Sequence, residues 1–298
     1  MRSASGTEAS RELQPRELQL TEAPRSEALW PGASPPDAGR EPMHESARDP
    51  KNEPVTDPVP RKAFSEVGIN SHNPPSQKPL CQYRDLGRMS YSAAWDLQRD
   101  LVARRKAGEI PDQLLFVEHP HVITLGRNTD RKNVLVSESE RERLGIQLRE
   151  TDRGGDVTYH GPGQLVMYPI VDLRDWKRDV VAYVRALEQV IIESVARLGV
   201  KAEPLAGCTG VWVGEAKLAA IGIHISRWVT SHGVALNVSP RMEYFNYIVP
   251  CGIQKPVTSL EAITGRVIAC DTIIPLLAKN FSKIFKRQFE PPTFHVVR

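Results

Sequence analysis

The stretch VWVGEAKLAAIGIHISRWVTSHGVALNV, residues 211–238, decides the fold. It contains three β-rich pieces, each ended by glycine or small polar residues: VWV, KLAAIGIHISRW and VTSHGVALNV. A parallel crossover needs a dozen or more connecting residues, so strands this close in sequence favour antiparallel pairing. The stretch therefore predicts an antiparallel sheet.

Further elements surround it. Strands are expected at 83–87, 113–118, 122–126 and 164–173, of which the last is mostly apolar. The second and third are separated by His119-Pro120-His121 and are either two strands or one interrupted strand. Helices are expected at 91–108, closed by glycine, at 180–198, capped by Asp179, and at 271–286. We predict an α+β domain over residues 81–298, a mixed, largely antiparallel sheet packed by helices, without an internal repeat or a second domain.

Residues 1–80 differ in composition. They hold 13 of the 24 prolines but only two aromatic residues, Trp30 and Phe64, so they offer little apolar surface to offset the entropy of ordering. We predict a disordered leader. Its recurring glutamates are not typical of a transit peptide, and no apolar run is long enough to cross a bilayer. The default expectation is a cytoplasmic protein with no membrane or nucleic-acid partner, and an organelle remains the alternative.

The cysteines show no metal-site spacing. Cys81, Cys208, Cys251 and Cys270 lie far apart without a CxxC pair or histidines at zinc-ligand intervals. No metal site and no disulfide framework are expected, and a functional thiol must act through its reactivity.

Cys251 is the candidate nucleophile. In Pro250-Cys251-Gly252-Ile253 the proline stiffens the backbone and the glycine removes bulk, which would let a substrate carbonyl reach the sulfur. A free thiol is only a few per cent thiolate at neutral pH, so something must favour the charged form. Taken alone, the tetrapeptide also fits a buried, inert cysteine, which is the common case.

Lys217 is the candidate partner. It opens the small, apolar run LAAIGI, where partial desolvation would lower the pKa of its ammonium group and a nearby thiolate could share its proton. A solvated lysine at the end of a strand is the ordinary alternative. Spacing alone does not pair Lys217 with Cys251.

The loop RGGDVTYHGPGQ, residues 153–164, is the third feature. Its four glycines allow close approach of the backbone to a ligand, yet no GK[ST] or GxGxxG pattern marks it as a phosphate or dinucleotide loop. His160 either contacts a substrate carbonyl or is satisfied by backbone hydrogen bonds. His232-Gly233 is a weaker repeat of the same pattern, and His119, His121 and His224 are assigned no chemistry.

Four motifs, taken in their order along residues 81–290, resemble the signature of the lipoyl(octanoyl) transferases: RGGDVTYHGPGQLVMYP, KLAAIGI, SHGVALN and PCGI. The resemblance implies the fold of the biotin and lipoate protein ligases. It also implies transfer of an octanoyl or lipoyl group from acyl carrier protein to a lysine of a lipoyl domain, the first step of protein lipoylation. His121 and His224 stand where proline and arginine are more usual in that family, which puts only partner contacts and regulation in doubt.

Carried over by position, the resemblance makes Cys251 the bearer of an acyl-thioester and Lys217 its base. The acyl and pantetheine pocket would be lined by Arg153, Gly154, Gly155, Asp156, Val157, Thr158, Tyr159, His160, Ala220, Ile221, Gly222, Gly233, Val234 and Ala235. No ATP and no metal would be required. The implied acceptors are the lipoyl domains of 2-oxoacid dehydrogenases and the H protein of glycine cleavage.

Three alternatives stay open. An ATP-dependent lipoate ligase would adenylate a free acid and have no need of Cys251. A cysteine thioester hydrolase would use Cys251 with His160 or His232 and release octanoate. A catalytically silent module would only bind the carrier protein.

Overall fold

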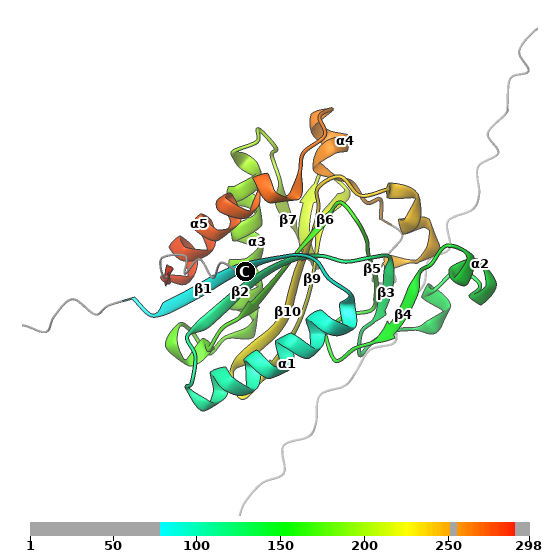
Figure 1. The fold of residues 1–298 in the computed structure, drawn as a ribbon. Helices are drawn as coiled ribbons and strands as arrows, with labels where there is room; N and C mark the ends of the chain where they lie inside the picture. The colour runs from blue at the N-terminus through cyan, green and yellow to red at the C-terminus, as the bar shows by residue number, and fades with distance from the viewer. Residues whose placement is uncertain (1–77, 251–254, 290–298) are drawn as a thin grey trace, which may run out of the picture. The chain divides into compact units, whose positions relative to one another are not determined.

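A computed structural model describes residues 78–250 and 255–289 of the chain. Its main sheet has eight strands in the order β11-β1-β2-β6-β10-β9-β8-β7 (Figure 1). Their bounds are β1 Leu80–Arg88, β2 Asp112–Glu118, β6 Gln164–Ile170, β7 Glu203–Leu205, β8 Cys208–Val213, β9 Ala216–Ser226, β10 Val229–Asn237 and β11 Gln288–Phe289. β1 pairs parallel with β2 and β11, and the other neighbours are antiparallel. The predicted α+β class is confirmed.

The three β-rich pieces of residues 211–238 form β8, β9 and β10. β9 and β10 are joined by a tight turn in which Arg227 and Trp228 have φ of 50° and 68°. Two consecutive residues with positive φ match the twist of a two-residue hairpin. Every residue of β10 is buried, because β6 and β9 pair with its two edges and helices cover the sheet.

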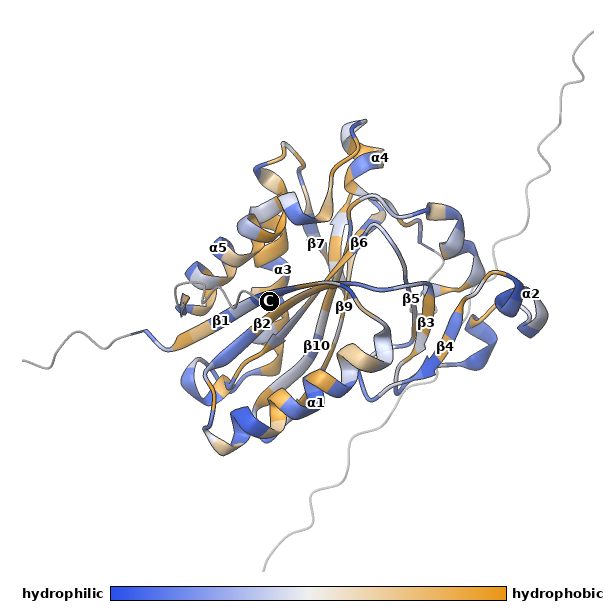
Figure 2. Cartoon of the chain, viewed as in Figure 1, coloured by the Kyte–Doolittle hydropathy of each residue, from blue (hydrophilic) through white to orange (hydrophobic). Residues whose placement is uncertain are grey.

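Helices cover both faces of the main sheet. The side chains of β2 alternate between the two faces, and both faces are apolar. Leu114 and Phe116 face the cluster that includes α3 (Val180–Ala196) and α5 (Ile274–Phe285). Leu115 and Val117 face α1 (Tyr91–Ala107). Figure 2 shows apolar residues concentrated on the strands and on the inner sides of these helices. Because β2 lies between two apolar layers, its residues from Leu114 to Val117 are all hydrophobic.

The helix ends follow their local sequence. Ser90 and Asp179 cap α1 and α3, accepting hydrogen bonds from the backbone N–H groups of Ala93 and Ala182. Gly108 ends α1 with a φ of 77°. The last helix begins later than predicted, at Ile274, because Pro275 suits a first turn and the preceding residues form a separate 3-10 turn.

A second, three-stranded sheet was not anticipated. It has the order β4-β3-β5, with β3 Val122–Leu125, β4 Gln147–Glu150 and β5 Val157–His160, and its own apolar cluster. β2 and β3 are thus separate strands in different sheets, on either side of His119-Pro120-His121. Shorter elements complete the described chain: η1 Arg131–Asn133, α2 Glu138–Arg143, η2 Leu173–Asp175, η3 Met242–Tyr247, α4 Leu260–Thr264 and η5 Cys270–Thr272.

The predicted leader lies mostly outside the described residues, since only 78–80 of it are described. Leu80 already belongs to β1, and the backbone N–H of Gln288 donates to the carbonyl of Pro79 at 3.0 Å. Residues 79 and 80, which the prediction assigned to the leader, therefore make contacts with the described fold. Among the described helices, none is both long and apolar enough to cross a membrane.

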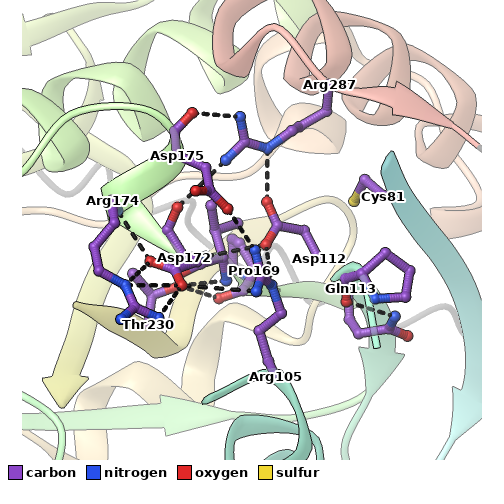
Figure 3. A network of polar contacts seen from close by, with 12 residues as sticks. Cys81, Arg105, Asp112, Gln113, Pro169, Asp172, Arg174, Asp175, Thr230 and Arg287 are labelled. Atoms are coloured by element: carbon purple, nitrogen blue, oxygen red, sulfur yellow. Dashed lines mark hydrogen bonds and ion pairs between the residues drawn. The ribbon is translucent and has the colours of Figure 1, made fainter. Parts of the chain in front are cut away.

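A buried ion network joins the start of β2 to α1 and to the end of α5 (Figure 3). Asp112 accepts from Arg287 Nε at 2.6 Å and from Arg105 Nε at 2.8 Å, and the side chains of Asp112 and Arg287 are only 0% and 1% exposed. Arg105 also binds Asp175 at 2.7 Å. Paired and hydrogen-bonded on several sides, these charges tolerate burial that would be costly for either alone.

We expect Arg287→Met to lower the free energy of unfolding by about 3–5 kcal/mol, because it leaves Asp112 buried without one of its partners. Urea unfolding measures this change. Arg197→Met, at an exposed position, is the matched control and should change stability by less than about 0.5 kcal/mol. Equal stability of the two variants would contradict the role given to the network.

Candidate functional site

A narrow pocket of about 50 Å³ is lined by residues of the glycine-rich loop, β5, β6, β9 and β10. It brings together most of the residues named from the sequence: Arg153, Gly155, Asp156, Val157, Thr158, His160, Ala220, Ile221, Gly222, Gly233, Val234 and Ala235. Its surface is mainly apolar. The structure therefore gathers segments that lie up to 82 positions apart in the sequence, from Arg153 to Ala235.

Small residues keep this pocket open. In the β9–β10 register Gly222 lies opposite Gly233, followed by Ile221 with Val234 and Ala220 with Ala235. A Cβ atom at Gly222 would lie 3.1 Å from both Arg153 Cδ and the carbonyl oxygen of Gly154. A side chain there would press into the loop that forms the opposite wall.

Arg153 fixes this loop to the smaller sheet. Its buried guanidinium donates to the carbonyl oxygen of Thr124 at 2.6 Å and to the Thr124 hydroxyl at 3.0 Å. The N–H of Gly154 donates to the carbonyl of Ile223 in β9 at 2.8 Å. The loop thus connects the two sheets, and its position relative to β9 is set by hydrogen bonds on both sides.

Two residues named from the sequence lie elsewhere. Gly154 lines a neighbouring cavity, described below. The ring of Tyr159 packs in the core of the smaller sheet, stacked with Tyr244 at 5.4 Å between centroids, and its hydroxyl lies 2.7 Å from His121 Nδ1. Tyr159 therefore packs behind the pocket wall and does not line the pocket.

His160 closes one end of the pocket, and a chain of hydrogen bonds sets its tautomer. Asn237 Nδ2 donates to the carbonyl of Thr258, Gln164 Nε2 donates to Asn237 Oδ1, and Gln164 Oε1 faces His160 Nδ1 at 2.7 Å. Since Gln164 presents an acceptor, His160 carries its proton on Nδ1. Neither Gln164 nor Asn237 was singled out from the sequence.

His232 is a second histidine of the pocket, and sequence reasoning gave it little weight. Its Nε2 donates to Asp152 Oδ1 at 2.6 Å, and its Nδ1 lies 3.4 Å from the hydroxyl of Tyr91. The contact with His232 is the largest cause of the lowered pKa of Asp152. Tyr91 and Asp152 come from α1 and from the segment before the loop, so only the fold could reveal this trio.

His119 lies behind these groups. Its Nδ1 donates to the carbonyl of Met89, and its Nε2 accepts from the Tyr168 hydroxyl, both at 2.8 Å. Burial lowers the pKa of His119 to about 4 and that of His160 to about 3. Both imidazoles are neutral at physiological pH, so this end of the pocket suits an uncharged, apolar group.

These two histidines make stability depend on pH. In the unfolded chain each has a pKa of about 6.5, so below that pH the unfolded state binds protons that the folded state does not. Stability is complete above pH 6.5 and falls as the pH drops, by up to about 1.4 kcal/mol per unit for each histidine. We expect His160→Asn to flatten the slope of unfolding free energy between pH 6 and 4.5, measured by urea unfolding. A variant slope parallel to that of the wild type would contradict the buried neutral state.

Lys217 lies on β9 and lines an adjoining cavity of about 490 Å³. The two spaces share Gly155, Asp156, Ile221 and Gly222 as walls. The Lys217 side chain is only 7% exposed, with Nζ 4.8 Å from the centroid of the Trp212 ring. The lysine is thus largely removed from solvent, and on β9 it lies six residues from Ile223, the register partner of His232.

Backbone contacts tie Lys217 to the chain that follows the PCGI motif. Its N–H donates to the carbonyl of Pro256 at 2.8 Å, and its carbonyl accepts from the N–H of Thr258 at 3.0 Å. Val249, Pro250, Pro256 and Val257 line one further cavity. Cys251 itself lies outside the described residues, so its predicted pairing with Lys217 stays a prediction.

The other cysteines are distinct in environment. Cys81 and Cys270 are buried, and burial raises the pKa of the Cys270 thiol to about 12. Cys208 is half-buried and lines the Lys217 cavity. Within residues 78–250 and 255–289, no group of three or more histidine, cysteine or carboxylate side chains is placed to hold a metal ion.

The fold and the pocket define a class. The structure resembles a crystal structure of lipoate-protein ligase A bound with ATP, with a TM-score of 0.58 and 16% identity over 74% of this chain and 90% of that one. A lipoate protein ligase structure from Thermoplasma acidophilum gives a TM-score of 0.57. These likenesses show the fold. Residues 90–282 match the family model of the lipoyl protein ligase A/B catalytic domain, and the chain belongs to that family.

Within the family, the similar curated proteins are octanoyltransferases. That of Solibacter usitatus is 56% identical over 71% of this chain and 96% of its own length. That of Koribacter versatilis is 49% identical over 70% of this chain and 86% of its own. The mitochondrial octanoyltransferase LIP2 of Arabidopsis thaliana is 46% identical over 66% of this chain and 87% of its own. The resemblance inferred from the motifs is confirmed.

Proposed function

We propose that this protein is an octanoyltransferase that works through an acyl-thioester on Cys251. The octanoyltransferase activity itself follows from the family and from relatives at 46–56% identity. The observation that supports the proposed mechanism is the adjacency of two spaces, a narrow apolar pocket and the cavity of Lys217, which share Gly155 and Ile221 as wall residues. We place the acyl chain in the first space and the transfer step in the second.

The pocket suits a straight, uncharged chain. Its far end is closed by neutral His160 and by His232, whose ring nitrogens face Asp152 and Tyr91. Each methylene that enters it contributes about 0.8 kcal/mol of binding free energy. An acyl chain of the length that fills the pocket would then have its thioester carbonyl beside Lys217.

In the first half-reaction, the Cys251 thiolate attacks the octanoyl thioester. The bond between the carbonyl carbon and the pantetheine sulfur breaks as the new carbon–sulfur bond to Cys251 forms. Lys217, as an ammonium group, gives a proton to the departing pantetheine thiolate. Thioester exchange conserves the bond type, so this half is nearly isoenergetic and needs no ATP.

In the second half-reaction, the acceptor is a lysine whose unperturbed pKa of about 10.4 leaves it almost wholly protonated at pH 7. The acceptor ammonium first loses one proton to solvent, and Lys217, now neutral, removes the second proton as the amine attacks the octanoyl-enzyme. The amide forms and the Cys251 thiolate leaves. One buried lysine thus serves both halves, first as acid and then as base.

The partners that the family resemblance implies, and that we propose, are octanoyl acyl carrier protein as donor, and lipoyl domains of 2-oxoacid dehydrogenases and the glycine cleavage H protein as acceptors. Residues 81–298 carry a net charge of +5, which suits acidic partners. We propose a cytoplasmic location for the protein, although the Arabidopsis relative is named as mitochondrial.

A transfer assay with two donors tests this function. Octanoyl carrier protein and a lipoyl domain are mixed with the enzyme without ATP, and free octanoate with ATP and magnesium is the parallel reaction. We expect octanoylated lipoyl domain only from the first. Product from octanoate and ATP would favour a ligase, and release of octanoate from the carrier protein without product would favour a hydrolase.

A further inference from the structure

A separate cavity of about 350 Å³ lies between α1 and the β9–β10 hairpin, and we call it the α1 cavity. Trp95, Gln98, Val102 and Lys106 line it from α1 at steps of three and four residues, so they share one face of the helix. Arg99 and Ala103 of α1 also line it, and the hairpin and the segment before the glycine-rich loop supply Asp152, His224, Ser226, Arg227 and Ser231. None of these residues lines the Lys217 cavity.

The charges in the α1 cavity are unbalanced. Within residues 78–250 and 255–289, neither Lys106 nor Arg227 makes an ion pair or a side-chain hydrogen bond; Lys106 is half-buried and Arg227 is exposed at the mouth of the hairpin turn. Burial, followed by the charge of Arg227, lowers the pKa of the Lys106 ammonium. Arg99 at the rim is already paired with Asp96. Two cations facing one space without a counter-ion repel each other, and a bound anion would relieve this.

The only carboxylate of the cavity is already engaged. Asp152 accepts from His232 Nε2 at 2.6 Å, and its other oxygen lies 3.7 Å from His224 Nε2. It therefore does not neutralise Lys106 or Arg227.

Two buried polar groups beside the cavity also have no partner among the described residues. Gln98 is 1% exposed, and its Oε1 accepts from the backbone N–H of His232 at 2.8 Å, which turns its Nε2 away from that bond. This Nε2 and the Nδ1 of His224 make no hydrogen bond. A buried donor is rarely left unsatisfied, so Gln98 Nε2 beside a cationic cavity points to a ligand with oxygen acceptors, and His224 Nδ1 joins it as a donor when the imidazole is protonated.

The α1 cavity is distinct from the reaction centre. His224 follows Lys217 by seven positions on the same extended strand, which at about 3.3 Å per residue places them roughly 23 Å apart along β9. A group bound beside His224 would not contact an acyl group held at Lys217. It would lie near the apolar pocket, because Asp152 of the α1 cavity is hydrogen-bonded to His232, which lines that pocket.

We propose that the α1 cavity binds a divalent oxyanion, either inorganic phosphate or the phosphate of a small monoester. Two unpaired cations match two negative charges, whereas a monocarboxylate would leave one cation uncompensated. The guanidinium of Arg227 offers paired donors to phosphate oxygens, and Lys106 offers a mobile ammonium. Gln98, Ser226 and Ser231 add neutral donors.

Calorimetric titration of the full chain with inorganic phosphate, at constant ionic strength and pH 7.5, tests this site. We expect saturable binding that weakens at least tenfold in the double variant Lys106→Gln/Arg227→Gln. The matched control is Lys201→Gln/Arg197→Gln, which removes the same two charges from exposed positions elsewhere and should bind as the wild type does. Far-UV circular dichroism checks that both variants are folded.

Two more titrations identify the ligand. Glycerol 3-phosphate binding more tightly than phosphate would indicate a monoester, and the reverse order would indicate free phosphate. Acetate should bind at least tenfold more weakly than either. Absence of saturable phosphate binding, equal loss in the control variant, or acetate binding as tight as phosphate would overturn the proposal.

Discussion

Cys251→Ala is expected to abolish the octanoyl adduct on the enzyme and to lower the rate of octanoyl transfer by at least about a thousandfold. The alanine side chain cannot form a thioester, so the two-step route is lost and only direct attack by the acceptor lysine remains. That amine is almost wholly protonated at neutral pH, and no covalent intermediate would hold the acyl group while the partners exchange.

Cys208→Ser is the matched control for this variant. Cys208 is half-buried and lines the Lys217 cavity, so among the described cysteines it is the one that could compete for the acyl group. We expect it to retain adduct and transfer. Intact mass before and after mixing with octanoyl carrier protein, together with the rate of lipoyl-domain modification, measures both variants. An adduct that survives in Cys251→Ala and vanishes in Cys208→Ser would reassign the nucleophile.

Lys217→Ala is expected to slow both half-reactions by about a hundredfold to ten-thousandfold, the range typical for loss of a general acid or base. The lysine is buried beside Trp212, and its backbone is bonded to Pro256 and Thr258, so its place on β9 is fixed. Without its positive charge the Cys251 thiol should also ionise at a higher pH.

Stopped-flow measurement of acyl-enzyme formation and of its discharge to a lipoyl domain separates the two halves. The pH dependence of Cys251 alkylation by iodoacetamide reports on the thiol, with Cys208 replaced by serine to remove competing reaction. Lys217→Arg keeps a charge but not a usable proton, so it should retain an easily ionised thiol and still transfer slowly. An alkylation profile of Lys217→Ala that overlays the wild type would refute the dyad.

Three neighbouring strands of the main sheet, β8, β9 and β10, could be predicted because they follow one another in the sequence. The β8–β10 run carries its own turn signals, and the helical stripes of α1 and α3 are bounded by capping residues in the sequence. The smaller sheet could not be foreseen in this way. β3, β4 and β5 have four residues each, and β3 pairs parallel with a strand that follows a separate helix. Such short segments carry too few apolar positions to show a period.

Some residues of the pocket could likewise be predicted from the sequence, and others could not. Its glycines and small apolar residues are concentrated in dense motifs, so the wall formed by the loop, β9 and β10 could be named in advance. The partners of the histidines could not, because Tyr91, Asp152 and Gln98 reach His232 from elements separated by 80 positions or more. Tyr159 was wrongly expected to line the pocket because it belongs to the motif. Its ring instead packs in the core of the smaller sheet.

A single-turnover chase tests whether this chain is a cysteine acyltransferase. Enzyme loaded from octanoyl carrier protein is freed of donor and mixed with a lipoyl domain in the absence of ATP, and intact masses of both proteins are followed in time. We predict that the octanoyl-sized increase leaves the enzyme and reaches the lipoyl domain at matching rates and in equal amounts. An increase that stays on the enzyme, or that leaves it as free octanoate while the lipoyl domain remains unmodified, would contradict the mechanism.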